Sequence, residues 1–80
     1  MIKFSVPVNS NVTLTVYNLL GQVVKVLTNE EVTAGNYSIT WNGTDNSGVQ
    51  VSSGIYFYEL KAKGNNGADF SKIMKMVYLK

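Results

Sequence analysis

The sequence predicts an all-β domain in which two antiparallel sheets pack face to face. Short runs of alternating apolar and polar residues recur at intervals of about 10 to 12 residues, and clusters of Gly, Asn and Ser separate these runs. The apolar spacing of an amphipathic helix is absent throughout. Because 80 residues suffice for only one hydrophobic core, we expect residues 1–80 to form a single domain.

The first two strands are predicted from a clean alternation of side chains. In the first, every second residue from Ile2 to Val6 is apolar, and the run ends at Pro7, the only proline of the chain. In the second, residues 12–17 place valine or leucine at every second position, with threonine between them. Each strand therefore has one apolar face for a core and one polar face.

A third strand is expected over Val23–Leu27, where β-branched residues surround Lys25. Since the pleat sends successive side chains to opposite faces, Lys25 and both ends of the run should point outward. Val24 and Val26 should then face the core. Residues 30–35, which follow, are polar and predict a loop.

A fourth strand is predicted at Tyr37–Trp41, and a turn-rich segment follows at residues 42–48. In this segment we expect Asp45 and Asn46 to hydrogen-bond the backbone and Gly48 to adopt a positive φ. A calcium loop is the alternative interpretation. Calcium usually takes several carboxylates among its ligands, and this segment has only one, so we predict no metal site.

The last two strands form a predicted hairpin. Residues 55–63 place Tyr56 and Tyr58 on the inner face and glutamate and lysine on the outer face. The Gly-Asn-Asn-Gly sequence at residues 64–67 is a strong turn signal and leads into a final strand, about residues 70–79. Within that strand, the set that contains Met74, Met76 and Tyr78 is expected to face the core.

Six to seven short strands, none able to cover its own apolar face, favour an immunoglobulin-like antiparallel β-sandwich. Aromatic side chains such as Trp41 could in principle form a platform for a sugar. Because the strand phase directs Trp41, Tyr56 and Tyr58 inward, core packing is the preferred interpretation.

The composition argues against several classes of function. The chain has no His and no Cys, so it lacks the usual bases and nucleophiles, and we predict neither an enzyme nor a cofactor. It also has no arginine, which makes nucleic acid an improbable partner. No apolar run is long enough for a membrane span, and Met1–Val8 is too short for a signal peptide. An extracellular role would therefore require a longer precursor.

Charge is distributed unevenly along the chain. Residues 1–60 carry two lysines and four carboxylates, whereas residues 61–80 carry five lysines and one carboxylate. The predicted hairpin would gather several of these lysines on one outward face, which suits an acidic partner. Alternatively, lysines on exposed or edge strands only prevent sheets from pairing with one another. The lysines in question are Lys61, Lys63, Lys72, Lys75 and Lys80.

Five motifs occur along the chain in an order that resembles one family. They are Phe4–Pro7, Val12–Asn18 with Leu20–Gln22, Ala34–Asp45, Ser53–Tyr58 and Lys75–Lys80. The ordered set resembles the C-terminal sorting domain of type IX secretion cargo, which is similar in pattern to the immunoglobulin-like domain of the flagellar hook-capping protein. The resemblance covers nearly the whole chain. By position, Gly54 and Tyr56 match its Gly-x-Tyr element, and Lys72, Lys75 and Lys80 match its basic terminal motif.

The resemblance implies a non-catalytic secretion signal. Such a module directs the cargo protein to which it is attached through the outer-membrane translocon, and a sortase-like peptidase then removes it. The domain would lie in the periplasm in transit and afterwards at the cell surface or outside the cell. Two alternatives stay open: an immunoglobulin-like spacer or assembly domain of an extracellular protein or filament, and a carbohydrate-binding accessory module. Exposed strand edges would also allow self-association.

Overall fold

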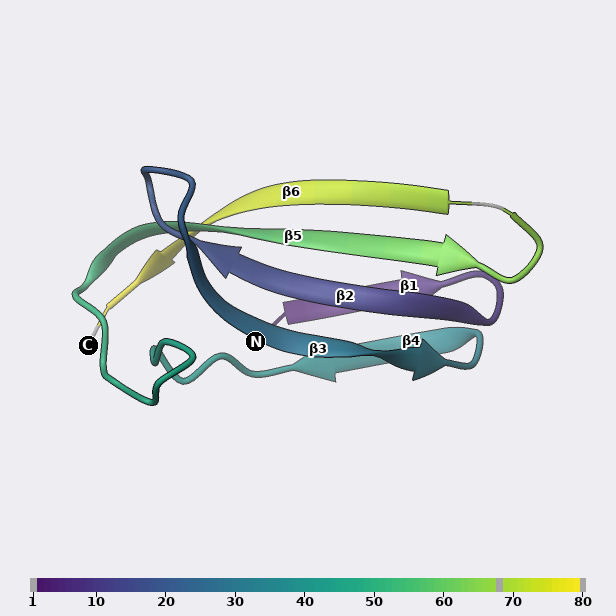
Figure 1. Cartoon of the computed structure of the whole chain (residues 1–80), viewed down its shortest axis with the longest axis horizontal. Coiled ribbons are helices and arrows are strands. Elements are labelled where there is room, and N and C mark those ends of the chain that lie inside the picture. Colours follow the sequence, from purple (N-terminus) through teal and green to yellow (C-terminus); the bar gives the residue numbers. More distant parts are fainter. Residues whose placement is uncertain (1, 68, 80) are drawn as a thin grey trace.

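A computed structural model describes residues 2–67 and 69–79, and its regular secondary structure consists of β-strands (Figure 1). None of these residues belongs to a helix that is long and apolar enough to cross a membrane. The molecule is elongated, with principal extents of 39 × 20 × 20 Å. Its strands are β1 (Ile2–Val6), β2 (Ser10–Tyr17), β3 (Val23–Val32), β4 (Gly35–Ile39), β5 (Gly54–Gly64) and β6 (Asp69–Tyr78).

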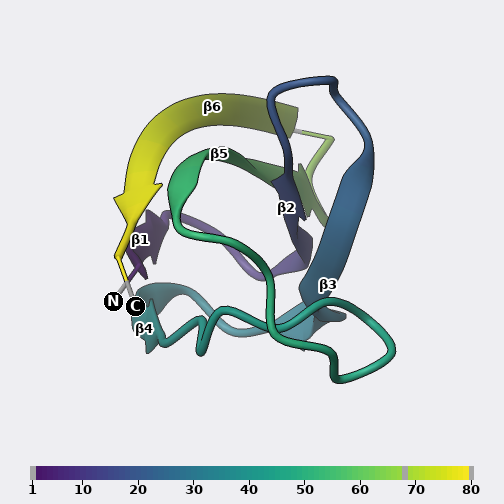
Figure 2. The ribbon, with the colours of Figure 1, turned by 90° about the vertical axis from the view of Figure 1, so that its left-hand side faces the viewer.

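The strands form two sheets, and every pairing is antiparallel. The larger sheet has the order β3-β2-β5-β6, and the smaller sheet pairs β1 with β4. Viewed along the long axis, the four-stranded sheet arches over the two-stranded one, and β6 and β1 lie toward the same side of the molecule (Figure 2). The predicted immunoglobulin-like β-sandwich is confirmed, with six strands in the described part of the chain.

The inward faces of the two sheets form the hydrophobic core. Val12, Leu14 and Val16, the apolar set of β2, are fully buried. Burial of each such side chain contributes about 1.5–3 kcal/mol. Around Val12 and Leu14 the core includes Ile2 and Leu60, and the smaller cluster around Val16 includes Val24 and Tyr56. The alternation predicted for β1 and β2 is therefore the alternation that builds the core.

The course of β3 differs from the prediction in length and in phase. The strand continues to Val32, because residues 28–32 pair with β2. The loop expected at residues 30–35 is therefore reduced to residues 33–34. Two register shifts in the pairing with β2 add residues to β3 and change which side chains face inward. Val26 is consequently 41% exposed, whereas Leu27 packs against both core clusters. Lys25 is half-buried and donates a hydrogen bond to Thr44 Oγ1 at 3.0 Å.

The predicted turn and phase of the β5–β6 hairpin are confirmed. Gly67 has a φ of 82°, and its N–H donates to the Gly64 carbonyl at 3.0 Å. In β6, Met76 and Tyr78 pack against the core, as expected, and Ile73 and Val77 are exposed. Met74, which was also expected to face the core, is 39% exposed, because it lies closer to the open side of the sandwich. The last strand thus lies over the margin of the core and leaves its outer face uncovered.

Candidate functional site

The β5–β6 hairpin carries the residues predicted to be recognised by a partner. Gly54 begins β5 and lies opposite Tyr78, and Tyr56 lies opposite Met76. The Gly-x-Tyr element is therefore held beside the C-terminal end of β6. Lys80 lies outside the described residues.

Tyr56 is part of the core and not of the surface. It is 8% exposed, and its hydroxyl donates to the Ser52 carbonyl at 2.6 Å. Its ring meets Trp41 edge-on, with a centroid separation of 5.1 Å. The prediction that Trp41 and Tyr56 serve core packing is confirmed. Tyr56 thus shapes the start of β5, and a partner would contact its neighbours instead.

The loop after β4 supports the end of β6. The Trp41 indole donates to the Thr44 carbonyl at 2.9 Å and lies 5.1 Å from the Tyr78 ring, centroid to centroid. Gly43 is buried beneath Tyr78 with a φ of 77°, and a Cβ at Gly43 would overlap that ring. The close approach of loop and ring therefore depends on a residue without a side chain.

The turn at residues 42–48 has the predicted local hydrogen bonds. Asp45 Oδ1 accepts the N–H groups of Ser47 at 2.9 Å and Val49 at 3.0 Å, and Gly48 has a φ of 83°. Asn46 Oδ1 accepts the N–H of Val26 at 3.0 Å, which ties the loop to β3. These bonds account for the polar residues of the segment as parts of a tight turn.

Lys72 and Lys75 lie on opposite faces of β6. Lys75 pairs with Phe57 on the outer face, whereas Lys72 pairs with Leu60 and shares its inward side. Lys72 is therefore not among the lysines that the hairpin gathers on its outward face. The sequence does indicate this inward orientation of Lys72, because Lys72 is in phase with Met74 and Met76, which were expected to face the core.

The outer face of β6 is a mixed apolar and basic surface. Lys75 lies between Ile73 and Val77, each 62% exposed. On β5, Ile55 lies opposite Val77 and Phe57 lies opposite Lys75. We call this set, residues 55, 57, 73, 75 and 77, the outer β5–β6 surface. Apolar side chains exposed around a lysine are suited to contact with another protein.

Beside this surface, a carboxylate is held between a tyrosine and a lysine. Glu59 accepts a hydrogen bond from the Tyr17 hydroxyl at 3.2 Å and lies 3.7 Å from the Lys61 ammonium. Burial, together with the hydrogen bond and the negative charge of Glu59, raises the pKa of Tyr17. Tyr17 is therefore neutral at physiological pH.

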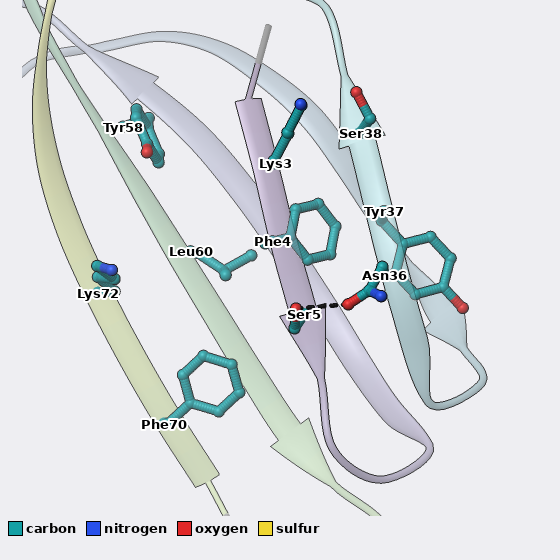
Figure 3. Close-up of a pocket in the computed structure, with 10 residues that line it drawn as sticks. All are labelled: Lys3, Phe4, Ser5, Asn36, Tyr37, Ser38, Tyr58, Leu60, Phe70 and Lys72. Atoms are coloured by element: carbon teal, nitrogen blue, oxygen red, sulfur yellow. Dashed lines mark hydrogen bonds between the residues drawn. The ribbon is translucent and has the colours of Figure 1, made fainter.

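The inner side of β6 borders a cavity of about 690 Å³ that lies between the layers on the side of β1 and β6 (Figure 3). Its aromatic and aliphatic lining comes from Phe4, Tyr37, Tyr58, Leu60 and Phe70. Sequence reasoning missed this cavity, because no alternation of side chains reveals how far apart two strands lie. Its polar lining is formed by Lys3, Ser5, Asn36, Ser38 and Lys72.

Comparison with known families gives a match over most of the chain. Residues 3–67, most of the chain, match the model of the FlgD Ig-like domain. No curated protein sequence matches the chain.

Proposed function

The chain belongs to the FlgD Ig-like domain family, and from this premise we propose that it is a non-catalytic C-terminal secretion signal. In this role it directs an attached cargo protein through the type IX outer-membrane translocon, and a sortase-like peptidase then removes it. It passes through the periplasm and ends at the cell surface or outside the cell. The family relation supports the immunoglobulin-like part of the proposal, and the surface of the last strand supports the recognition role.

The observation that carries the proposal is the exposure of β6. This strand is the edge of the larger sheet, so one row of its backbone groups has no strand partner within the described structure. Its outer face presents Lys75 between two exposed apolar residues, Ile73 and Val77. A receptor could add a strand to the free edge and bind the outer face at the same time.

Charge should set which receptor is recognised. β6 carries Lys72 and Lys75 against one carboxylate, Asp69, and these two lysines form no ion pair within the described residues. A receptor surface with exposed carboxylates would therefore be complementary to this strand.

The proposal is tested by export of a reporter. Residues 1–80 are fused to the end of a fluorescent protein that is delivered to the periplasm of a host with type IX machinery. The fusion should reach the medium or the cell surface. Retention of the fusion in the periplasm would contradict the proposal.

A charge-reversal series then tests the role of β6. Replacing Lys72, Lys75 and Lys80 together by Glu should lower export, because the charge of the terminal motif is reversed. A double control, Lys61→Glu with Lys63→Glu, changes charge on β5 only and should export normally. The circular dichroism of both variants shows whether they fold. Normal export of a folded triple variant would remove the charge argument.

An immunoglobulin-like spacer or assembly domain is the second candidate, and the family match favours it specifically, since that family is defined on a flagellar protein. An open reading frame that continues into further domains beyond Lys80 supports a spacer. A large catalytic or adhesive domain before the chain, with a stop codon after Lys80, supports the signal. Growth of particle size with concentration in light scattering would support assembly.

A further inference from the structure

The cavity between β1 and β6 is bounded by two free strand edges. Within the described structure β1 pairs only with β4, and β6 pairs only with β5. Alternate N–H and C=O groups of β1 therefore point away from β4, toward the open side of the sandwich. A strand that lay along β1 would satisfy these groups and extend the two-stranded sheet.

The lining of the cavity selects the side chains of such a strand. Leu60 is 5% exposed and belongs to the core, whereas Phe70 is 37% exposed and so has a partly uncovered ring. Phe4 and Tyr58 are half-buried and pack against the same core. A large apolar side chain entering here would cover the exposed part of Phe70 and continue the core outward.

The charges at the cavity are all of one sign. Lys3 and Lys72 are among the lining residues, and no lining residue is acidic. Neither lysine forms an ion pair with a carboxylate among residues 2–67 and 69–79. Lys72 pairs with Leu60 and Phe70 pairs with Ala62, so both lie on the inner face of β6. Figure 3 shows the ring of Phe70 extending toward β5. Lys72 and Phe70 are two positions apart, so a neighbouring strand with an apolar and an acidic residue at alternate positions would match both.

We propose that this cavity receives an extended segment of a partner protein, which adds as a strand to the free edge of β1. The segment places a large apolar side chain against Phe4, Leu60 and Phe70, and a carboxylate two positions away binds Lys72. The site is distinct from the outer β5–β6 surface. It does not depend on a role in secretion, because a spacer domain could accept a neighbouring protein in the same way.

The first test is a peptide titration of the purified 80-residue chain, followed by amide NMR shifts. The probe is a peptide of about seven residues, long enough to span β1, with threonine alternating with leucine and glutamate. Shifts should concentrate in β1 and around Leu60 and Phe70 and leave the outer β5–β6 surface unchanged. No saturable shift, or shifts confined to the outer surface, would overturn the proposal. If Lys72 only prevents other strands from pairing here, the peptide should give no saturable shift.

A matched pair of variants tests the charge. Lys72→Glu should weaken binding of the acidic peptide about tenfold and strengthen binding of a peptide with lysine in place of glutamate. Lys75→Glu makes the same change on the same strand but on the outer face, and it should bind as the wild type does. If Lys72→Glu unfolds the domain, Lys72→Gln serves in its place, with a smaller loss. Equal affinities of the Lys72 and Lys75 variants would overturn the assignment of the carboxylate.

Backbone methylation tests strand addition. Two N-methylated versions of the peptide are made. In each version every second backbone nitrogen is methylated, which removes the N–H donors along one edge of the extended peptide, and the two versions differ in which edge is blocked. At least one version should lose binding, and retention by both would exclude backbone pairing. If instead the free domain dimerises through β1 and leaves the peptide unbound, the occupant is a second copy and the proposal is wrong.

Discussion

The contact between Gly43 and Tyr78 makes a sharp prediction about how the end of β6 is held. Gly43 is buried with a φ of 77°, and a Cβ at this position would overlap the Tyr78 ring. The substitution Gly43→Ala should therefore act in two ways: it forces an L-residue into the left-handed region, and it pushes Tyr78 away from Trp41.

The two effects can be separated because Gly21 provides a control. Gly21 has a φ of 79°, and a Cβ there would meet nothing within 4 Å. Gly21→Ala should thus cost only the backbone strain, about 1–2 kcal/mol. Gly43→Ala should cost about 1–2 kcal/mol more, since the ring contact at 5.1 Å between Trp41 and Tyr78 is disturbed. The combined loss expected for Gly43→Ala is a large part of the total free energy of unfolding, which is roughly 4–12 kcal/mol for a domain of this size.

The assay is urea unfolding followed by circular dichroism and by the fluorescence of Trp41, the only tryptophan. The free energy of unfolding should fall further for Gly43→Ala than for Gly21→Ala. In a Tyr78→Ala background the difference between the two glycine positions should disappear. Equal losses at the two positions in the wild-type background would refute the steric argument.

Three further predictions concern stability. Leu14→Ala should lower the free energy of unfolding by about 3 kcal/mol, because Leu14 is fully buried. Leu20→Ala should change it little, because Leu20 is 83% exposed. Equal effects of the two substitutions in urea unfolding would contradict the described core. Asp45→Ala should lower the free energy of unfolding by about 1–2 kcal/mol and speed amide hydrogen exchange at Ser47 and Val49, since both N–H groups lose their acceptor. Unchanged exchange at these two amides would contradict the hydrogen bonds of the turn. Tyr17 has a raised pKa in the folded state, so its stabilising contribution is complete below about pH 10 and disappears as the pH rises further. Tyr17→Phe should accordingly flatten the decrease in unfolding free energy above about pH 10, and an unchanged slope would contradict the burial and hydrogen bond of Tyr17.

The outer β5–β6 surface and the β1–β6 cavity lie on opposite faces of the same edge strand. Lys75 belongs to the first and Lys72 to the second, so single charge reversals at these positions address different contacts. An export defect that follows Lys75 alone would locate receptor recognition on the outer face. A peptide-binding defect that follows Lys72 alone would locate strand addition at the cavity.

The sequence by itself determined the all-β class, five of the six strand positions to within a few residues, and the inward faces of β1, β2, β5 and β6. These features are local, because the pleat fixes the alternation of side chains within each strand and glycine fixes where turns can occur. Tertiary structure decided what depends on pairing between strands. The register shifts against β2 moved Leu27 inward and Val26 outward. It also decided that β1 and β6 are edges, and hence that a cavity opens between them, because the spacing of strands distant in sequence is set by packing of the whole domain.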